Sequence, residues 1–456
     1  MSVEAKAKYL GTVLQVAVPS PLRRVFDYLP VQSPQTLAEP QVGIRVRVSF
    51  GRQQLIGIVV AVANSSTLEK KKLKPILASL DSEPLLSDAV FKLLLWAANY
   101  YQHPVGEVFA AALPAKLRNG IPLRGNSKFW TASEPSTSEA SSLSRAVKQK
   151  ALLSFIRHEG EVSESKLRQA KFSKQLLAQL LQKNLVEEHS RAEVAAAPFE
   201  PLKTESNFDI ELNEEQRIAV TTISKSLGEY KCFLLNGITG SGKTEVYMRI
   251  MQEQLSKGLQ CLVLVPEIGL TPQTIARFKQ RFSCAVVSLH SGLNETERMT
   301  AWSQARDGSA GIVIGTRSAI FTPLAKPGLI VIDEEHDSSF KQQDGFRYSA
   351  RDLAVSRARQ EGICIVLGSA TPSLESLHNA RSSKFVHLHL TQRTGIDQSS
   401  AMEVIDVSSE AMVEDFSEQL LYRIRKHIQQ RNQVLVFINR RGFAPVLNCQ
   451  TCGWIC

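Results

Sequence analysis

The sequence predicts a multidomain α/β protein, and three observations support this prediction. From about residue 210 onward, short apolar runs typical of strands alternate with helical patterns, which indicates a parallel sheet covered by helices. Within residues 10–63, apolar and polar residues alternate at the period of a β-strand. A compact helical pattern lies between these regions. We therefore expect a small β-rich domain, a helical module and a parallel α/β domain, in that order.

The composition is that of an ordinary globular protein. The chain has 456 residues, of which 43% are hydrophobic and 21% charged, and this length suggests about three domains. No apolar run approaches the ~18 residues that a membrane span needs, and the first residues lack the apolar core of a signal peptide. We therefore expect a cytoplasmic protein without a membrane partner. The net charge of +10 favours polyanionic partners, although many basic proteins bind no nucleic acid.

Residues 1 to about 110 are expected to form the β-rich domain. Its strand-like segments are followed by a strong helical pattern with one apolar face at residues 85–101. Residues 111–144, which include a run rich in Ser, Thr and Glu, are expected to be a linker. The periodicity alone assigns no function to the domain.

Residues 145–197 are expected to form the helical module. Three short helical patterns are followed by a candidate wing strand at residues 185–187. A winged helix fits this pattern, and a plain three-helix interaction module fits it equally well. In a winged helix, the candidate phosphate contacts are Lys166, Arg168, Lys171 and Lys174.

The segment KCFLLNGITGSGKT, residues 231–244, is the most specific motif in the chain. A buried strand, a glycine-rich turn and the start of a helix follow one another, as the motif G-x-x-x-x-G-K-[ST] requires. Such a turn aims backbone N–H groups at phosphate, and the helix N-terminus adds positive potential. Lys243 is expected to bind the β- and γ-phosphates of ATP, and Thr244 to bind Mg²⁺. The full set of predicted nucleotide-binding residues in this loop is Gly237, Thr239, Gly240, Ser241, Gly242, Lys243 and Thr244.

A second motif, LIVIDEEH at residues 329–336, is an apolar strand that ends in a cluster of acids. Asp333 is placed to hold Mg²⁺, and Glu334 to orient the water that attacks the γ-phosphate. About 90 residues separate this cluster from the glycine-rich loop, which suits neighbouring strands joined by a crossover. The two motifs together predict a site that hydrolyses ATP.

The DEEH segment resembles the DExH box of nucleic-acid helicases and translocases. Further segments match that superfamily in chain order: Gln216, residues 264–267 with 271–273, residues 315–319 and residues 368–372. The resemblance implies that Gln216 lies near the adenine and that Thr316 and Arg317 contact DNA. It also implies that His336 is part of the catalytic set, and that Ser369 and Thr371 couple hydrolysis to motion.

The segment that follows, DSSFKQQDGFRYSARD at residues 337–352, interleaves aromatic and basic side chains. Rings stack on bases and cations meet phosphates, so this composition suits single-stranded DNA. It is similar to the aromatic-rich loop of certain DNA helicases, which links DNA binding to hydrolysis. The expected DNA contacts are Phe340, Lys341, Phe346, Arg347, Tyr348 and Arg351. A partly buried hydrophobic loop is the alternative.

The combined motifs resemble the bacterial primosomal protein N′ family of replication-restart helicases. The resemblance includes residues 25–30, 50–54 and 95–101 near the N-terminus and residues 439–443 and 449–454 near the C-terminus. It implies a RecA-like helicase lobe at 198–395, preceded by a 3′-DNA-end-binding domain and a winged-helix domain. In the first of these, Phe26, Asp27, Tyr28 and Arg52 are expected to bind DNA. Asp27 would accept a hydrogen bond from the free 3′-hydroxyl.

By this resemblance, the protein is an ATP-dependent 3′-to-5′ DNA helicase that recognises stalled or branched forks and initiates primosome assembly. The implied cofactors are ATP, Mg²⁺ and Zn²⁺, with Cys449 and Cys452 as zinc ligands. The implied partners are single-stranded and forked DNA with a 3′-hydroxyl end, other primosome proteins, single-stranded-DNA-binding protein and the replicative-helicase loader, which would place the protein at the nucleoid. A double-stranded DNA translocase and a non-catalytic, nucleotide-switched DNA-binding module are the alternatives.

The chain departs from the family pattern in two places. Cys456 lies closer to Cys452 than we expect for the family's next zinc ligand, so it is not predicted as one. Residues 396–448 are expected to begin a second helicase lobe, with a strand at 434–437, that the chain does not finish. That lobe supplies arginines that face the γ-phosphate. We therefore expect a fragment that binds nucleotide and branched DNA without unwinding it.

Overall fold

The computed structural model describes residues 9–31, 41–124, 126–133, 146–192, 195–202, 211–394, 402–407, 412–413, 416–437 and 454. The chain divides into two compact units, residues 1–395 and 396–456. Among the described residues, no helix has the length and apolar character needed to cross a membrane. The larger unit holds every site considered below.

The N-terminal region is a six-stranded sheet followed by three helices. Its strands are β1 (Tyr9–Ala17), β2 (Phe26–Leu29), β3 (Arg45–Phe50), β4 (Gln53–Ser66), β5 (Lys74–Pro75) and β6 (Ala78–Ser79), in the order β5-β2-β1-β4-β3-β6. The helices are α1 (Asp88–Tyr100), α2 (Val105–Ala112) and α3 (Ala115–Arg118), and a short 3₁₀ turn, η1, spans Lys70–Lys72. The predicted β-rich domain with a covering helix is confirmed, and it extends beyond residue 110.

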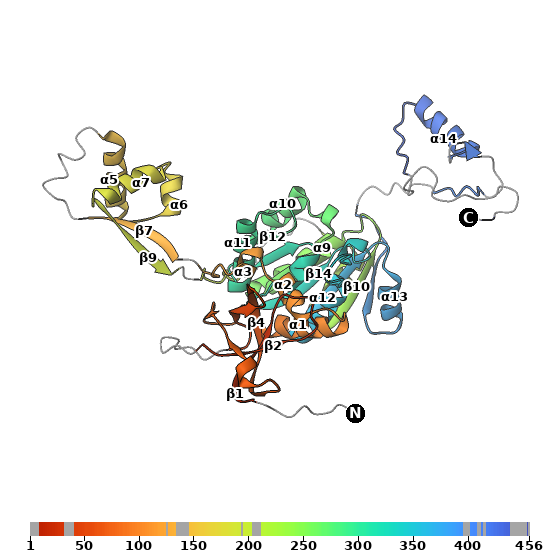
Figure 1. The fold of residues 1–456 in the computed structure, drawn as a ribbon. Helices are drawn as coiled ribbons and strands as arrows, with labels where there is room; N and C mark the ends of the chain where they lie inside the picture. The colour runs from red at the N-terminus through yellow and green to blue at the C-terminus, as the bar shows by residue number, and fades with distance from the viewer. Residues whose placement is uncertain are drawn as a thin grey trace. The chain divides into compact units, whose positions relative to one another are not determined.

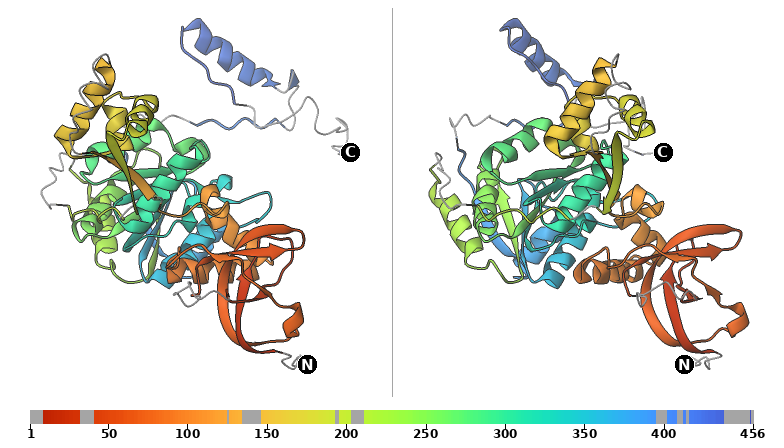
Figure 2. Two further views of the ribbon diagram at one scale, coloured as in Figure 1. Left: turned by 60° about the vertical axis from the view of Figure 1, so that its left-hand side comes forward. Right: turned by 90° about the vertical axis from the view of Figure 1, so that its left-hand side faces the viewer.

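The apolar faces of α1 and α2 belong to the same hydrophobic core as helices of the α/β domain. Figures 1 and 2 show these two helices between the N-terminal sheet and that domain. Arg306 strengthens the junction by donating to the carbonyl oxygens of Leu85 (3.0 Å) and Pro84 (3.1 Å), and to the Glu83 carboxylate (3.0 Å). The N-terminal region and the α/β domain are therefore packed together within one unit.

A small module consists of three helices and a three-stranded antiparallel sheet. Its elements are β7 (Asn126–Ala132), α5 (Val147–Glu159), β8 (Glu161–Ser163), α6 (Glu164–Gln169), α7 (Lys174–Gln182) and β9 (Val186–Ala192), with strand order β8-β7-β9. The sheet favours a winged helix over a plain three-helix module. Of the predicted phosphate contacts, Lys166 pairs with Glu159 at 2.5 Å.

The segment expected to be a linker, residues 111–144, contains regular structure instead. It includes α3 and the central strand β7, whose Trp130 side chain is buried in the core of the module. The indole N–H also donates to Glu188 on β9 at 3.2 Å. The linker prediction failed because β7 is short and lies beside a Ser/Thr-rich run. Such a strand has too few residues to show the alternation of apolar and polar residues.

The α/β domain contains a seven-stranded, entirely parallel sheet in the order β12-β13-β11-β14-β15-β10-β16. The strands are β10 (Lys231–Gly237), β11 (Gln260–Leu264), β12 (Val286–Leu289), β13 (Ile312–Gly315), β14 (Pro327–Ile332), β15 (Cys364–Ser369) and β16 (Val386–Leu390). The helices are α8 (Glu214–Ser224), α9 (Lys243–Ser256), α10 (Pro272–Arg281), α11 (Glu295–Asp307), α12 (Ala350–Glu361) and α13 (Leu374–Arg381). Three 3₁₀ turns complete it: η2 (Glu267–Gly269), η3 (Arg317–Phe321) and η4 (Ser338–Phe340).

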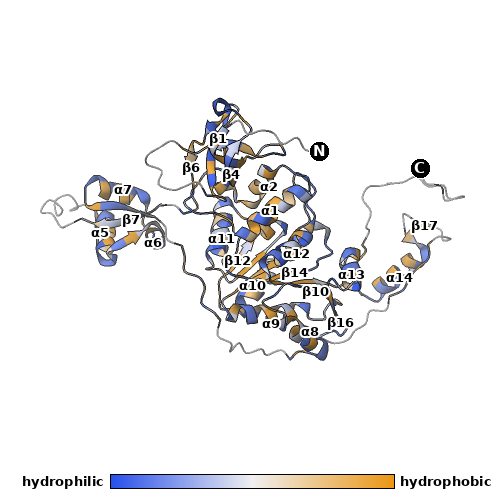
Figure 3. Cartoon of the chain, turned by 90° about the horizontal axis from the view of Figure 1, so that it is seen from below, coloured by the Kyte–Doolittle hydropathy of each residue, from blue (hydrophilic) through white to orange (hydrophobic). Residues whose placement is uncertain are grey.

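Successive strand residues point into two different cores. Phe233 and Leu235 of β10 pack toward α8 and α9, whereas Leu234 packs toward the side of α11 and α12. A strand buried on both faces has a continuous apolar sequence rather than an alternating one. The apolar strands lie between the more polar outer helices in Figure 3. The predicted parallel α/β architecture is confirmed.

The second unit contains, among its described residues, β17 (Met412–Val413), β18 (Phe416–Ser417) and α14 (Glu418–Gln429). The strand expected at residues 434–437 is wrong: these residues are described without regular structure, and the Leu435 side chain is 95% exposed. An apolar segment forms a strand only when a neighbouring strand pairs with it. Among the described residues, no strand pairs with residues 434–437. Cys449, Cys452 and Cys456 lie outside the described residues.

Candidate nucleotide and DNA-end sites

The glycine-rich loop between β10 and α9 has the backbone conformation of a phosphate cradle. Gly240 and Gly242 adopt positive φ angles of 79° and 80°, which residues with a Cβ atom rarely do. Gly242 is also the N-cap of α9, so the helix begins at Lys243, directly after the loop. The buried Lys243 ammonium donates to the Gly237 carbonyl at 2.8 Å. The predicted nucleotide-binding residues thus lie together at the start of one helix: Gly237, Thr239, Gly240, Ser241, Gly242, Lys243 and Thr244.

Gln216, which the sequence analysis expects near the adenine, lies against this loop. Its amide nitrogen donates to the Ser241 carbonyl at 2.8 Å, and a Cβ atom on Gly242 would lie 2.3 Å from that nitrogen. Asn213 fixes the position because it forms a reciprocal capping box with Gln216 at the start of α8. Only glycine at position 242 therefore allows Gln216 to approach the loop this closely.

The acid cluster follows β14, and it shares a cavity of about 430 Å³ with the start of α9. Thr244, Asp333, Glu334 and His336 all line this cavity. Burial and the nearby Glu334 carboxylate raise the pKa of Asp333, and the Lys243 ammonium opposes this shift. Glu334 has a φ of +49°, a conformation that strains a residue with a side chain. A hydroxyl and a carboxylate that face one cavity are suitable ligands for Mg²⁺ and its water shell.

The two motifs are not on neighbouring strands, which corrects the prediction from their spacing. Strand β15 lies between β10 and β14 and pairs in parallel with both. The inserted strand ends in Ser369, whose hydroxyl lies 2.7 Å from His336 Nδ1 and accepts from the Thr371 backbone N–H at 3.0 Å. The spacing could not reveal this because β15 comes later in the chain than either motif. The predicted coupling residues therefore lie between the two halves of the site.

Glu335 is a buried residue of the acid cluster to which the sequence analysis assigned no role. Its carboxylate accepts from the Ser373 backbone N–H (2.7 Å) and from the hydroxyls of Ser373 (3.0 Å) and Ser376 (2.8 Å). Arg351 forms an ion pair with it at 3.2 Å. The continuous acidic run DEEH was the only sequence signal for this role. Arg351, predicted as a DNA contact, is instead largely buried and held by Glu335 and Asp352.

The aromatic-rich loop does not present its rings to solvent, which runs against the predicted base stacking. Phe340, Phe346 and Tyr348 are only 3–6% exposed. Phe346 packs edge-on against Tyr101 at 5.8 Å and stacks on His103 at 5.3 Å. Tyr348 packs against Phe321 and Phe346, both at 4.9 Å. The alternative of a buried hydrophobic loop therefore holds for these three rings.

Basic residues around the loop divide into two groups. Lys341 and Arg347 are exposed, as a DNA contact requires. Arg317 instead donates to the carbonyl oxygens of Ser339 (2.8 Å) and Lys341 (3.1 Å), and the preceding Thr316 is buried. In this conformation, Arg317 therefore holds the loop in place with its guanidinium.

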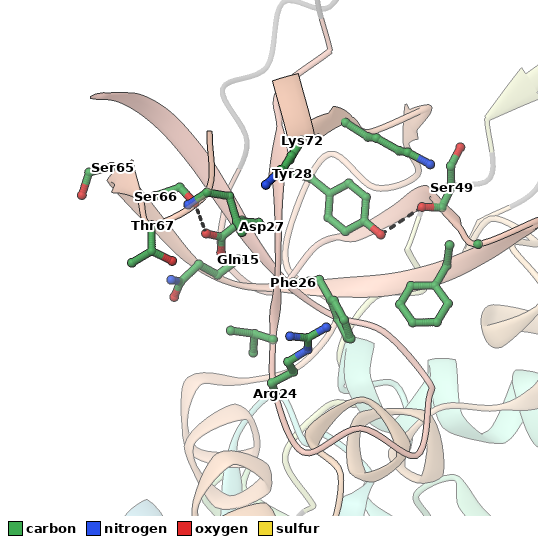
Figure 4. Close-up of a pocket in the computed structure, with 15 residues that line it drawn as sticks. Gln15, Arg24, Phe26, Asp27, Tyr28, Ser49, Ser65, Ser66, Thr67 and Lys72 are labelled. Atoms are coloured by element: carbon green, nitrogen blue, oxygen red, sulfur yellow. Dashed lines mark hydrogen bonds between the residues drawn. The ribbon is translucent and has the colours of Figure 1, made fainter. Parts of the chain in front are cut away.

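The predicted DNA-end residues Phe26, Asp27 and Tyr28 line a cavity of about 620 Å³ in the N-terminal sheet (Figure 4). The Ser66 hydroxyl donates to Asp27 Oδ2 at 2.5 Å, and the Tyr28 hydroxyl donates to the Ser49 carbonyl at 3.0 Å. The cationic lining residues are Arg24, Lys72 and Lys74. A single carboxylate surrounded by three cations suits a ligand that combines a hydroxyl donor with phosphate.

One predicted DNA-end residue lies outside this cavity. Arg52 is exposed in the turn between β3 and β4, and it is absent from the lining residues. Ser66 lines the cavity but was not predicted, because serine in a polar run has no distinctive pattern. For zinc, the described residues hold no group of three or more metal-ligating side chains, and the predicted ligands Cys449 and Cys452 are not among them.

Two family models match the chain in the regions of these two cavities. Residues 15–114 match a model described as the PriA 3′ DNA-binding domain (3′BD), and residues 213–380 match the DEAD/DEAH box helicase model. The first match contains the cavity around Asp27, and the second contains the phosphate cradle and the acid cluster. Each match therefore covers a site identified from its geometry.

Curated relatives match almost the whole chain. The replication restart protein PriA of Haemophilus influenzae is 42% identical, over 97% of this chain and 60% of that protein. PriA of Bacillus subtilis is 31% identical over 91% of this chain and 60% of that protein. PriA of Chlamydia pneumoniae is 35% identical over 96% of this chain and 59% of that protein. The chain thus spans about 60% of the length of these relatives.

Proposed function

Because this chain belongs to the PriA family of replication restart proteins, we propose that it acts in an ATP-dependent 3′-to-5′ DNA helicase that recognises branched replication forks. The family predicted from the sequence, there called primosomal protein N′, is confirmed by the relatives. The observation that supports the proposed activity most is the single cavity lined by Thr244, Asp333 and Glu334 beside the phosphate cradle. Such a cavity brings phosphate, metal and attacking water to one place.

In the proposed reaction, Lys243 exchanges the Gly237 carbonyl for the β- and γ-phosphates of ATP. Mg²⁺, held by Thr244 and through water by Asp333, would neutralise charge on those phosphates. Glu334 accepts a hydrogen bond from the attacking water and orients it toward the γ-phosphate. Gln216, which contacts the cradle through Ser241, would lie near the adenine. Positioning and electrostatics account for most of such catalysis, because phosphoryl transfer needs little covalent chemistry from the protein.

The proposed transmission from hydrolysis to DNA runs through the strand between the two motifs. His336 follows the catalytic acids and contacts Ser369 at the end of β15, which in turn holds Thr371. Glu335 ties the same segment to Arg351 at the end of the aromatic-rich loop. A change in the acid cluster would therefore reach both the loop and the segment after β15 through direct contacts.

The cavity around Asp27 is proposed to bind the 3′-terminal nucleotide of a DNA strand. A free 3′-hydroxyl can donate to Asp27 as the Ser66 hydroxyl does, and the bases would lie between Phe26 and the other lining side chains. A terminal phosphate would instead bring negative charge to the carboxylate, which is unfavourable. The cavity would therefore select a 3′-hydroxyl end.

The remaining features of the proposal depend on the family. The module with α5, α6 and α7 would contact fork DNA as a winged helix, and Cys449 and Cys452 would bind Zn²⁺. Single-stranded-DNA-binding protein, other primosome proteins and the replicative-helicase loader would be partners in primosome assembly at the nucleoid. Residues 396–448 would belong to the second helicase lobe.

Fork binding by this chain tests the end-recognition part of the proposal. Forks with a 3′-hydroxyl or a 3′-phosphate are compared by fluorescence anisotropy, with wild type and Asp27→Asn. We expect wild type to favour the hydroxyl about tenfold or more, as loss of a hydrogen bond to a charged group predicts, and Asp27→Asn to lose this preference. As a control, Asp344→Asn removes a carboxylate from an exposed loop and should retain the preference for the 3′-hydroxyl. Equal affinities of wild type for both ends would refute the pocket.

A further inference from the structure

Two stacked aromatic rings lie exposed on helix α1, outside both cavities. Trp96 and Tyr100 are about one helical turn apart, and their ring centroids are 4.7 Å apart with an interplanar angle of 17°. The Trp96 side chain is 38% exposed and the Tyr100 side chain 64%. Flat apolar surface of this kind, left in water, is a common feature of binding sites.

One cation, Lys341, lies near the Tyr100 end of this stacked pair, on the side of the aromatic-rich loop. The Tyr101 ring packs edge-on against Tyr100 at 4.9 Å, and the Lys341 ammonium lies 5.3 Å from the centre of the Tyr101 ring. Lys341 also donates to the Arg347 carbonyl at 3.0 Å, which keeps the backbone of exposed Arg347 close to it. The nearby acid Asp352 is already paired with Arg351 at 3.0 Å. The charge beside the rings therefore favours an anion.

A second set of contacts joins the end of α1, next to the pair, to the cavity around Asp27. Arg23 donates to the Gln102 side chain, whose amide nitrogen also caps the Asn99 carbonyl at 2.6 Å. Gln102 lies two residues beyond the end of α1 and has a left-handed conformation, with φ of 54°. The next residue after Arg23 is Arg24, which lines the cavity and lies 5.0 Å from the centre of the Phe26 ring. Contacting residues thus lead from the cavity to the end of α1.

We propose that Trp96 and Tyr100 form a stacking platform for bases of the single strand that leads away from the terminal nucleotide bound near Asp27. Aromatic rings bind bases of any sequence through stacking, and neighbouring Lys and Arg side chains attract the phosphates. This inference rests on the proposed function, since its ligand is the strand whose end the cavity would bind. Phe346 and Tyr348 were predicted to stack on bases, but their rings are buried. In this proposal, Trp96 and Tyr100 provide the stacking surface instead.

Two probes of different length test the platform. A deoxydinucleotide fills only the cavity, whereas an oligo(dT) of about 12 nucleotides also reaches α1. We expect Tyr100→Leu and Trp96→Leu to weaken binding of the longer probe on the order of tenfold each and to leave dinucleotide affinity unchanged. Unchanged affinity of the Trp96→Leu/Tyr100→Leu double variant for the longer probe would overturn the proposal.

Controls separate the platform from folding and from the cavity. Tyr422→Leu removes another ring that is 64% exposed, on α14, and should leave affinity for both probes unchanged. Trp96→Phe keeps a ring and should retain most of the affinity that Trp96→Leu loses. Platform variants should keep the preference for a 3′-hydroxyl over a 3′-phosphate, whereas Asp27→Asn should lose it. Failure of the end pocket and failure of the platform therefore give different results.

Discussion

The Tyr247 hydroxyl lies 3.2 Å from Asp333 Oδ1 and donates a hydrogen bond to it. Tyr247 is on α9, three residues after Thr244, and its side chain is almost fully buried. The contact joins the helix that begins at the phosphate cradle to the carboxylate that we assign to Mg²⁺. We therefore treat Tyr247 as a positioning residue, since its hydroxyl orients Asp333.

Tyr247→Phe should weaken the dependence of nucleotide binding on Mg²⁺ without unfolding the protein. Losing a partner that orients a metal-binding group typically lowers metal affinity by at least about tenfold. We expect the Mg²⁺ concentration for half-maximal binding of a fluorescent ATP analogue to rise by about that factor. Tyr28→Phe also removes a tyrosine hydrogen bond, to Ser49, and should leave the Mg²⁺ titration unchanged.

Asp333→Asn should make the protein more stable at neutral pH, although it impairs Mg²⁺ binding. Burial raises the pKa of Asp333 above its usual value, so the folded protein holds this proton more tightly than the unfolded chain does. The ionised carboxylate therefore lowers stability as the pH rises through the raised pKa. Urea unfolding should show Asp333→Asn gaining stability over wild type at pH 7, with the difference disappearing below about pH 4. A difference that does not depend on pH would contradict this cause.

Gly368→Ala should destabilise the fold through Tyr247. A Cβ atom at position 368, at the end of β15, would lie 1.4 Å from the Tyr247 hydroxyl oxygen. Overpacking in a rigid core costs about 1–3 kcal/mol, and this overlap is severe, so thermal unfolding should show a loss at or above that range. Gly269→Ala, whose nearest neighbour would be 3.5 Å away, should have little effect on stability.

Arg347→Ala and Arg351→Ala should have different consequences, although both residues were predicted to bind DNA. Arg347 is exposed, so its loss should weaken the binding of single-stranded DNA. The slope of the logarithm of the binding constant against the logarithm of salt concentration should fall in magnitude by about one, because one counterion fewer is released. Arg351 pairs with buried Glu335, so its loss should cost about 3–5 kcal/mol of stability by leaving that carboxylate unpaired. Salt titrations of oligonucleotide binding and urea unfolding distinguish the two effects, and an Arg351→Ala variant with wild-type stability would show that the ion pair is unimportant.

The glycine-rich loop and the acid cluster were predictable because the phosphate chemistry proposed for them fixes both residue type and local backbone. Gly240, Gly242 and Lys243 lie as the motif requires, and Asp333 follows its apolar strand. The order of strands was not predictable from spacing, since β15 inserts between two strands that precede it in the chain.

Long-range packing accounts for the other differences between prediction and structure. Phe346 is buried because Tyr101 and His103, more than two hundred residues earlier, cover it. Trp130 belongs to a sheet strand because β9 pairs with it, although its neighbours in the sequence are typical of a linker. Alternation and composition report on local structure, and neither shows which distant element will cover a side chain.

Binding of Mg²⁺-ATP measured by calorimetry tests the central claim most directly, with wild type, Lys243→Ala and Glu334→Gln. We predict that wild type binds Mg²⁺-ATP. Lys243→Ala should lose this binding because the ammonium group that binds the phosphates is gone. Glu334→Gln should retain it because Glu334 orients the attacking water and does not hold the nucleotide. Absence of binding by wild type, or binding by Lys243→Ala equal to that of wild type, would contradict the assignment of this site to ATP.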